Sequence, residues 1–293
     1  MPVFATPEPI SVTLDLAAAN VRFIASDRAD TVVEVRPSRP SKPADVRSAE
    51  QAEVEYADGG LRVHTSKGRL YYAWFAAGES VDITIELPTG SAVRGEISYG
   101  NLRTEGRLGW CAVKTGAGEI TIDEAGPIEL RTGAGGVSIA TATGHADIET
   151  RAGGVRIRQV DGSAAIKNSY GDTTIGAATG ELRVKGAYGS IWVDLALGPV
   201  DVKTAHGSVR LDEVVRGEVR LESSFGALEV GIRQGTAAWL DVATQHGSVL
   251  NSLGAHEGPG ASDETAEVRA RSNWGDIVIR RSNEQNTKNR SNS

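Results

Sequence analysis

Aromatic side chains recur at fixed intervals along this chain of 293 residues. Rings one interval apart can stack on one another, so such a column can fill space or present a surface to a ligand. Strict strand alternation predicts that this column, and a column of small polar residues two positions earlier, point inward. The pattern therefore favours a structural ladder over a ligand-facing aromatic groove. The first column is Tyr99, Ala117, Ala134, Ala152, Tyr170, Tyr188, His206, Phe225, His246 and Trp274, and the second is Thr115, Thr132, Thr150, Asn168, Gly186, Thr204, Ser223 and Thr244.

A short basic strip and one tryptophan are the candidate binding residues of the repeats. Lys167, Lys185 and Lys203 share one outward column, and this strip could dock an anionic surface. The alternative, which the nearby Asp201 favours, is a solvated face with partly compensated charge. Trp192 falls in an outward phase, and a large aromatic residue on a polar sheet often marks an interface.

A second group of aromatic residues gathers in an insertion near the N-terminus. Tyr71, Tyr72, Trp74 and Phe75 lie within six residues of one another. The group could pack as a plug on the first repeat, or it could form an exposed tip that binds a partner or touches a membrane. The sequence leaves both interpretations open.

Candidate metal and catalytic residues are few. His206 and His246 share a column but stand two repeats apart, about 9.6 Å, too far for one zinc ion. Asp194, Asp212 and Glu213 could stack as carboxylates that hold calcium or cleave a polysaccharide, although aspartate also favours turns. Phosphate-binding loops, nucleophile elbows and dinucleotide fingerprints do not occur, so we expect no cofactor, no metal and no enzymatic activity.

The amino-acid composition of the chain excludes several classes of partner and site. The net charge of −7 argues against a nucleic-acid partner. The lone Cys111 excludes an internal disulfide framework and a cysteine-based zinc site. No run of about 18 apolar residues occurs, so no transmembrane segment is expected. The first residues lack a basic and apolar leader, which predicts a cytoplasmic location.

A glycine repeat predicts the strands and turns that position these residues. A glycine follows each residue of the aromatic column, mostly at intervals of 18 residues, and a second glycine lies about midway. Apolar residues alternate within each short segment, as in Ile191 and Val193 or Val200 and Val202. This predicts an all-β fold, a parallel β-solenoid with about 18 residues per coil and right-handed connections. An antiparallel sandwich is the alternative, but its strand spacing varies more.

The repeat also predicts the organisation of the chain as one continuous solenoid. Residues 1–99 form irregular, loop-rich N-terminal coils and a cap with two insertions, the first of which includes a short helix. Residues 100–250 form the regular solenoid, and residues 251–281 hold an insertion and the last coil. Residues 282–293 form a polar, disordered tail.

Three segments carry a family resemblance: TVVEVRPS, DITIELPTGSAV and NWGDIVIRRS, together with the glycine-punctuated strands. With them the chain resembles the putative-adhesin family of bacterial β-strand-repeat proteins, an actinobacterial type of domain of unknown function, over roughly residues 8–281. The resemblance implies a β-solenoid and brings no catalytic residues with it.

The leading functional hypothesis is a non-enzymatic scaffold or protein-interaction module with a protein partner. A rigid solenoid offers long faces for binding, and no acid, base and nucleophile are assembled. The alternatives are a self-assembling structural protein of the bactofilin type, a surface adhesin, and a carbohydrate-active β-helix enzyme that would use Asp194, Asp212 and Glu213.

Overall fold

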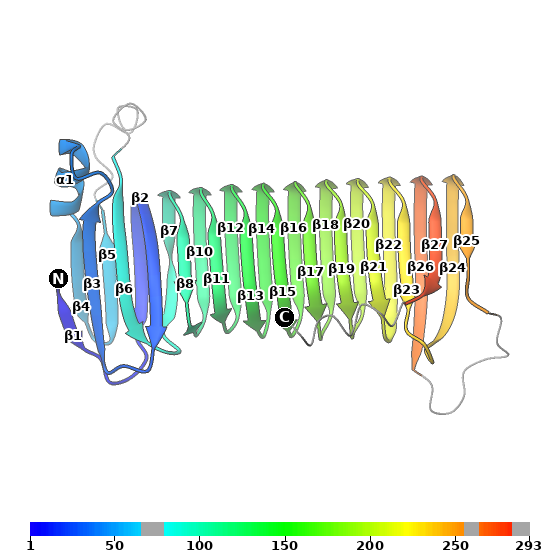
Figure 1. The fold of residues 1–293 in the computed structure, drawn as a ribbon, viewed down its shortest axis with the longest axis horizontal. Helices are drawn as coiled ribbons and strands as arrows, with labels where there is room; N and C mark the ends of the chain where they lie inside the picture. Colours follow the sequence, from blue (N-terminus) through cyan, green and yellow to red (C-terminus); the bar gives the residue numbers. More distant parts are fainter. Residues whose placement is uncertain (66–78, 255–263, 283–293) are drawn as a thin grey trace. The chain divides into compact units, whose positions relative to one another are not determined.

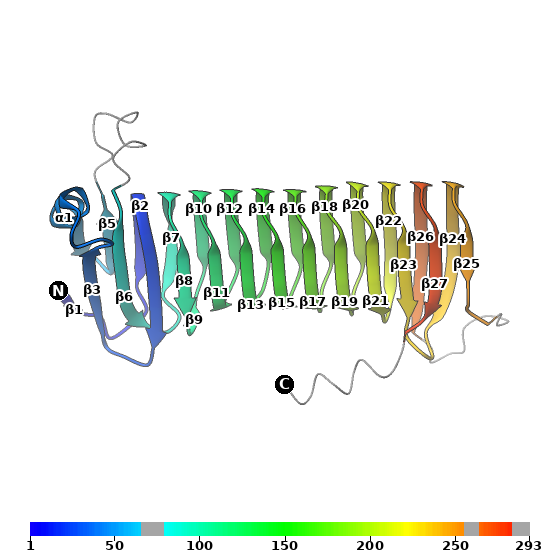
Figure 2. The same ribbon diagram turned by 45° about the horizontal axis from the view of Figure 1, so that its top comes forward.

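The computed structural model describes residues 1–65, 79–254 and 264–282. The chain divides into two compact units, Met1–Gly153 and Gly154–Ser293. Both units consist mainly of short β-strands, which Figures 1 and 2 show side by side within each unit. Each unit is described by itself below.

The first unit contains fourteen strands and one short helix among its described residues. They are β1 (Val3–Ala5), β2 (Ser11–Ser26), β3 (Asp30–Pro37), α1 (Pro43–Glu50), β4 (Glu53–Ala57), β5 (Gly60–His64), β6 (Val81–Pro88), β7 (Ala92–Tyr99), β8 (Leu102–Glu105), β9 (Arg107–Leu108), β10 (Cys111–Ala117), β11 (Ile120–Ala125), β12 (Ile128–Ala134), β13 (Val137–Thr143) and β14 (Ala146–Ala152).

The second unit contains thirteen strands in the part of it that the structure describes. They are β15 (Val155–Asp161), β16 (Ala164–Tyr170), β17 (Thr173–Ala178), β18 (Leu182–Tyr188), β19 (Ile191–Ala196), β20 (Val200–His206), β21 (Val209–Val214), β22 (Gly217–Phe225), β23 (Leu228–Ile232), β24 (Ala237–His246), β25 (Val249–Asn251), β26 (Thr265–Trp274) and β27 (Ile277–Arg281).

Both units are β-solenoids, which confirms the predicted fold. In each regular coil the chain contributes one strand to sheet A and one to sheet B, and each strand pairs in parallel with its counterpart in the next coil. In sheet B, for example, Leu182 of β18 pairs with Val200 of β20, which is 18 residues further along. The predicted alternation of apolar and polar residues therefore becomes alternation between the interior and the surface.

The interior between the two sheets is aliphatic. The predicted inward pairs are buried, including Ile191 and Val193 of sheet A and Val200 and Val202 of sheet B, all at 2% exposure or less. Stacked Val, Ile and Leu side chains fill the space between parallel strands because their branched side chains pack well on a pleated surface. Side chains at the intervening positions point outward, in opposite directions on the two sheets.

The turn from sheet B to sheet A explains the repeated glycine. Gly189 has a φ of 136°, in a region that only glycine adopts readily. A Cβ atom at this position would also lie 2.2 Å from the carbonyl oxygen of Gly171 in the preceding coil. The close stacking of successive turns thus excludes any side chain here.

The N-terminal coils depart from simple sequential stacking. The long strand β2 belongs to both sheets: it pairs with β5 and β7 in sheet B and with β6 and β8 in sheet A. β3 runs antiparallel to β6, and β4 and β5 form an antiparallel hairpin whose turn holds Asp58 and Gly59 at positive φ. Helix α1 confirms the short helix expected in the first insertion.

The last coils of the second unit are also out of sequence order. β26 pairs with β22 on one side and with β24 on the other, and β27 lies in the same way between β23 and β25. The sequence predicted that each coil stacks on the one before it, and that expectation is wrong here. The segment 264–282 returns to fill the position next to β22 and β23, so that β24 and β25 form the end coil (Figure 1).

No helix in the described part of the chain is long and apolar enough to cross a membrane.

Candidate binding surface

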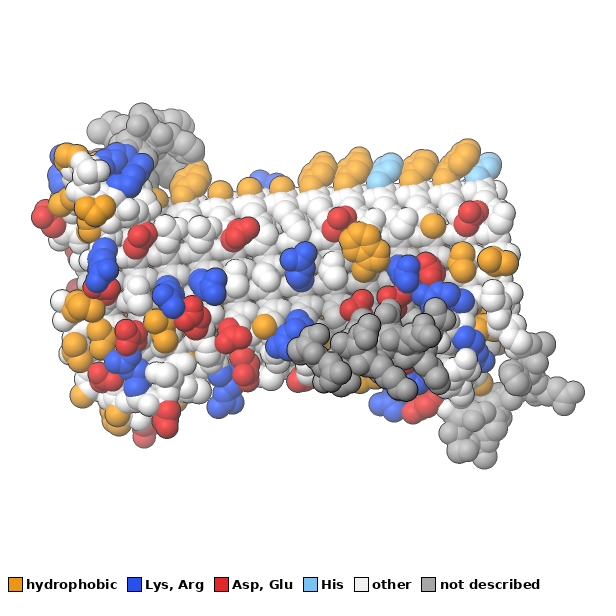
Figure 3. Space-filling model, in the orientation of Figure 1, with side chains coloured by type: hydrophobic (Ala, Val, Ile, Leu, Met, Phe, Trp, Pro, Cys, Tyr) orange, Lys and Arg blue, Asp and Glu red, His pale blue; other side chains and the backbone are white. Residues whose placement is uncertain are grey.

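One row of aromatic and histidine side chains projects from the second unit where sheet B turns into sheet A. Figure 3 shows hydrophobic and histidine side chains lined up along this edge. We call the row the aromatic ridge; in spatial order its members are Tyr170, Tyr188, His206, Phe225, Trp274 and His246.

The rings of the ridge stack face to face. The centroids of Tyr170 and Tyr188 lie 5.1 Å apart, those of Tyr188 and His206 4.7 Å, and those of His206 and Phe225 4.8 Å, with interplanar angles of 3–4°. Trp274 follows Phe225 in register, and His246 stacks on Trp274 at 3.9 Å. Parallel in-register strands impose this spacing because neighbouring strands lie about 4.8 Å apart.

The ridge is exposed, which corrects the predicted inward direction of the column. Tyr170, Tyr188, Phe225 and Trp274 are 56%, 48%, 49% and 52% exposed. The strict alternation ends two residues earlier, at the buried Asn168 in β16, and the chain then enters the glycine turn. The residue before the glycine therefore projects from the corner of the coil instead of following the strand phase.

The column of small polar residues does point inward, as predicted. Asn168 donates to the carbonyl oxygen of Gly171 (2.8 Å) and Thr244 donates to that of Gly275 (2.9 Å), so side chains of this column bond to the turns at these positions. The hydroxyls of Thr115, Thr132 and Thr150 are buried and have no hydrogen-bond partner among the described residues.

Because the rings cover each other's faces, the ridge offers their edges to solvent. These edges carry the phenol oxygens of the tyrosines, the imidazole nitrogens and the indole N–H. Each of the first four rings stands between a small residue and a glycine, as Tyr188 does between Ala187 and Gly189. The edges therefore protrude as a narrow, rigid strip that is apolar along its length and able to form hydrogen bonds at its rim.

The predicted basic strip lies on the outer face of sheet B. Lys167, Lys185 and Lys203 are exposed and in register on β16, β18 and β20. Lys203 Nζ lies 2.7 Å from Glu222 Oε2, and this hydrogen bond raises the pKa of the lysine. The basic strip thus ends at the next coil, where the carboxylate of Glu222 on β22 compensates the charge of Lys203.

Trp192 lies on the opposite face of the solenoid, on β19 of sheet A. Its side chain is 39% exposed, in register with Thr174 and Arg210, so its predicted outward direction is confirmed. The structure does not bring Trp192 and the lysines together, because the two sheets face away from each other. Their roles in binding stay predictions.

The aromatic insertion falls outside the described residues. Tyr71, Tyr72, Trp74 and Phe75 all lie within residues 66–78, and the polar tail from residue 283 onward is likewise outside the described ranges.

Two of the three carboxylates proposed for calcium binding or catalysis, Asp212 and Glu213, are engaged with arginines. Asp212 Oδ1 accepts hydrogen bonds from Arg210 (2.6 Å) and Arg280 (3.0 Å), and Glu213 forms an ion pair with Arg233. The hydrogen bond that Arg210 donates to Asp212 raises the pKa of Arg210, and the charge of Asp194 adds a smaller effect in the same direction. Arg280 of β27 also donates to Glu229 of β23 (2.6 Å), so this arginine links β21, β23 and β27 of sheet A.

The histidine pair is further apart than predicted, because both Phe225 and Trp274 lie between His206 and His246. Among residues 1–65, 79–254 and 264–282, no group of three or more His, Cys, Asp or Glu side chains could hold a metal ion.

Comparison with known proteins gives one family match. The sequence model of the family described as Toastrack DUF4097 matches residues 10–196. No curated protein matches the chain.

Several solved structures are similar over most of the chain. A putative adhesin from Parabacteroides merdae is 9% identical, with a TM-score of 0.43 over 94% of both chains. A putative adhesin from Parabacteroides distasonis is 10% identical, with a TM-score of 0.41 over 94% of this chain and 95% of its own. A putative cell adhesion protein from Clostridium sporogenes is 14% identical, with a TM-score of 0.24 over 96% and 98%.

Proposed function

The chain belongs to the Toastrack DUF4097 family, and we propose that it is a non-catalytic scaffold that binds a protein partner through the aromatic ridge. Its β-solenoid is a rigid support for a long, regular surface. Its assignment to an actinobacterial type of the family stays a prediction.

A comparison between the two units carries this proposal. In the first unit the same register position holds alanine in three successive coils: Ala117, Ala134 and Ala152. The coil is therefore built equally well without a ring at its corner. The rings of the second unit are not a requirement of the fold, and a continuous exposed aromatic row without a structural need supports a binding role.

The chemistry of the ridge favours a protein partner. Tyrosine and tryptophan dominate the energetically important residues of protein interfaces, because they combine apolar area with a hydrogen-bonding group and few rotatable bonds. The repeat of the rings equals the spacing between strands of a β-sheet, so side chains on neighbouring strands of a partner would meet successive rings.

Photo-crosslinking in the native cell tests the proposal. Benzoylphenylalanine is placed at Tyr188 or Phe225, and, as a control, at Arg156, which is exposed on β15 of the same unit. We expect both ridge positions to give the same adduct with a second protein and the control position to give none. In binding measurements with that purified protein, the double variant Tyr188→Ala/Phe225→Ala should weaken affinity by about 30-fold or more.

Two results would contradict the proposal. One is an identical adduct from Arg156, and the other is unchanged affinity of the double variant. An adduct only with a second copy of the chain would instead support the self-assembling alternative. The predicted cytoplasmic location is tested by fractionation of the same cells, and recovery of the chain at the cell surface would overturn it.

A further inference from the structure

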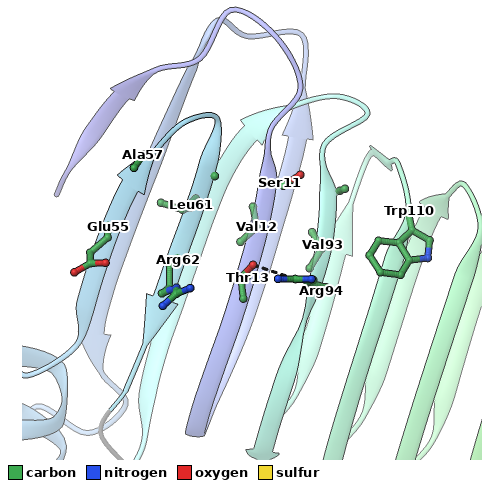
Figure 4. Close-up of a pocket in the computed structure, with 12 residues that line it drawn as sticks. Ser11, Val12, Thr13, Glu55, Ala57, Leu61, Arg62, Val93, Arg94 and Trp110 are labelled. Carbon is green, nitrogen blue, oxygen red and sulfur yellow. Dashed lines mark hydrogen bonds between the residues drawn. The ribbon is translucent and has the colours of Figure 1, made fainter.

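The first unit carries a separate hollow on the outer face of sheet B. Its volume is about 640 Å³, and it crosses β4, β5, β2 and β7 to the residue that precedes β10. Figure 4 shows Arg62, Thr13 and Arg94 on neighbouring strands of this face and Trp110 at one side. None of these residues belongs to the aromatic ridge.

A row of small residues forms the floor of the hollow. Ala57 pairs with Gly60, Gly60 with Ser11, and Ser11 with Ala92, so four adjacent strands present almost no side chain here. The row ends at Trp110, whose carbonyl oxygen accepts a hydrogen bond from the N–H of Val93 (2.9 Å). Trp110 is 43% exposed and closes this end of the row. The hollow is therefore an elongated trough that runs across the strands.

Two arginines line the trough. The adjacent row consists of Glu55, Arg62, Thr13 and Arg94 in register, all pointing outward. Arg94 Nε donates to Thr13 Oγ1 at 3.3 Å. Within the described part of the chain, no carboxylate lies within ion-pair distance of either guanidinium.

Two acidic residues of the next row, Asp15 and Glu96, already have basic partners. Asp15 lies 3.4 Å from His64, and Glu96 lies 3.2 Å from Lys114. The donors of Arg62 and the two terminal nitrogens of Arg94 thus remain for a ligand in the trough. A guanidinium recognises a carboxylate with two parallel hydrogen bonds, which gives geometric as well as electrostatic selectivity.

The spacing of the two arginines limits which ligands can contact both of them. Arg62 and Arg94 are separated by the strand that carries Thr13, so their backbones lie about 9.6 Å apart. A ligand that engages both must carry two acidic groups at about this separation. Its middle part would lie on the floor of small residues beside the hydroxyls of Ser11 and Thr13, and a ring at its end could pack on Trp110.

We propose that the trough binds an acidic oligosaccharide that bears a carboxylate on every second sugar. Alternate sugars of an extended chain place their carboxylates on the two arginines, while the hydroxyl-rich sugar between them suits a polar floor. A nucleic acid fits less well, because its densely spaced phosphates would meet Glu55 and the neighbouring acidic row of a chain with net charge −7.

Titration calorimetry with the full chain and a hyaluronan hexasaccharide tests the proposal, and the carboxyl-reduced hexasaccharide serves as the matched neutral ligand. We expect saturable binding of the acidic form only. Arg62→Gln and Arg94→Gln should each weaken it by about tenfold or more. Ala92→Phe, which fills the trough and keeps both arginines, should abolish binding of the acidic hexasaccharide.

Arg131→Gln is the control, since Arg131 lies on the same face but pairs with Glu129 at 3.1 Å. It should bind like the unaltered chain. Circular dichroism melting shows whether each variant is folded. Absence of saturable binding, equal binding of the neutral hexasaccharide, or equal binding of a ten-residue polyglutamate peptide would overturn the proposal. Because none of these variants changes the aromatic ridge, a negative result in this calorimetry experiment does not contradict the proposed function.

Discussion

Tyr188 and Ala117 occupy equivalent corners of their coils, yet one carries an exposed ring and the other a methyl group. A stacked aromatic pair contributes about 0.5–1.5 kcal/mol beyond the area that it buries. Tyr188 has two such neighbours, Tyr170 and His206. The ridge should thus add modestly to stability while the aliphatic interior provides most of it.

Substitution of Tyr188 by alanine separates these contributions. We expect Tyr188→Ala to lower the free energy of unfolding by about 1–2 kcal/mol, because two ring contacts are lost but no interior cavity forms. Leu211→Ala, at a fully buried position, should cost about 2–5 kcal/mol. Urea unfolding of both variants measures the difference, and an equal loss would show that the ring is part of the core.

Residue types alone could predict the composition of the ridge but not its direction. The period of the column was readable from the sequence, because each member precedes a glycine. Its exposure was not, since strict alternation fails where the strand ends, and the corner geometry depends on a glycine with positive φ. The trough was missed for a different reason: Arg62, Arg94 and Trp110 are brought together only by the pairing of β5, β2, β7 and β10.

At the scale of elements, helix α1 is attached to the first unit by a buried carboxylate. Asp45 is fully buried and binds Arg39 at 2.8 Å, and it accepts the N–H of Ser80 at 3.3 Å. Burial alone would raise the pKa of Asp45, but the hydrogen bonds from Arg39 and Ser80 outweigh it and hold the pKa below its usual value. The charged form of Asp45 therefore stabilises the folded state.

This predicts a loss of stability in acid. Since the folded pKa of Asp45 is lower than the unfolded value of about 3.9, its contribution is complete above that value and disappears as the pH falls through the folded pKa. Asp45→Asn should lower stability by about 1 kcal/mol at pH 7 and by less below pH 3. Melting curves from pH 7 to pH 2.5 measure this gap; Glu50→Gln, exposed on the same helix, should show none. A gap that stays constant with pH would contradict the account.

The order of the C-terminal coils gives a second prediction for elements. β22 and β24 both pair with β26, and β23 and β25 both pair with β27. A chain that ends at residue 254 loses both inner strands, so it should expose the unpaired edges of β22 and β23 and aggregate.

Light scattering of this truncated chain, compared with a chain that ends at residue 282, measures the effect. Sequential stacking would make residues 264–282 a dispensable end coil. A soluble truncated chain with an unchanged melting temperature would therefore contradict the observed strand order.

Sequence periodicity could predict the regular coils because one interval is repeated with little change, and parallel stacking then fixes the register. It could not predict the order of the end coils. A strand that returns to the middle of a sheet has the same alternation as one at its end, and only pairing distinguishes them. The same holds for β2, which lies between β5 and β7 although it precedes both in the chain.

At the scale of the whole molecule, the chain combines two solenoid units with different surfaces. The first unit presents Tyr99 and three alanines at the coil corners and a trough with two arginines, and the second presents the aromatic ridge. Each surface depends on the same property, the register that places equivalent residues of successive coils next to one another. Both binding proposals therefore rest on parallel, in-register stacking.

Pairs of introduced cysteines measure that register directly. Cys111 does not interfere, because it is buried and burial raises the pKa of its thiol to about 12. The variant Tyr170→Cys/Tyr188→Cys places two exposed thiols on adjacent coils, within the separation that a disulfide requires. The variant Tyr170→Cys/His206→Cys places them two coils apart, about 9.6 Å.

The decisive measurement is the fraction of intramolecular disulfide after mild oxidation of these two variants. In-register stacking predicts nearly complete crosslinking of positions 170 and 188 and almost none between positions 170 and 206. Crosslinking of the second pair, or free thiols in the first, would contradict the stacked coils and with them the aromatic ridge.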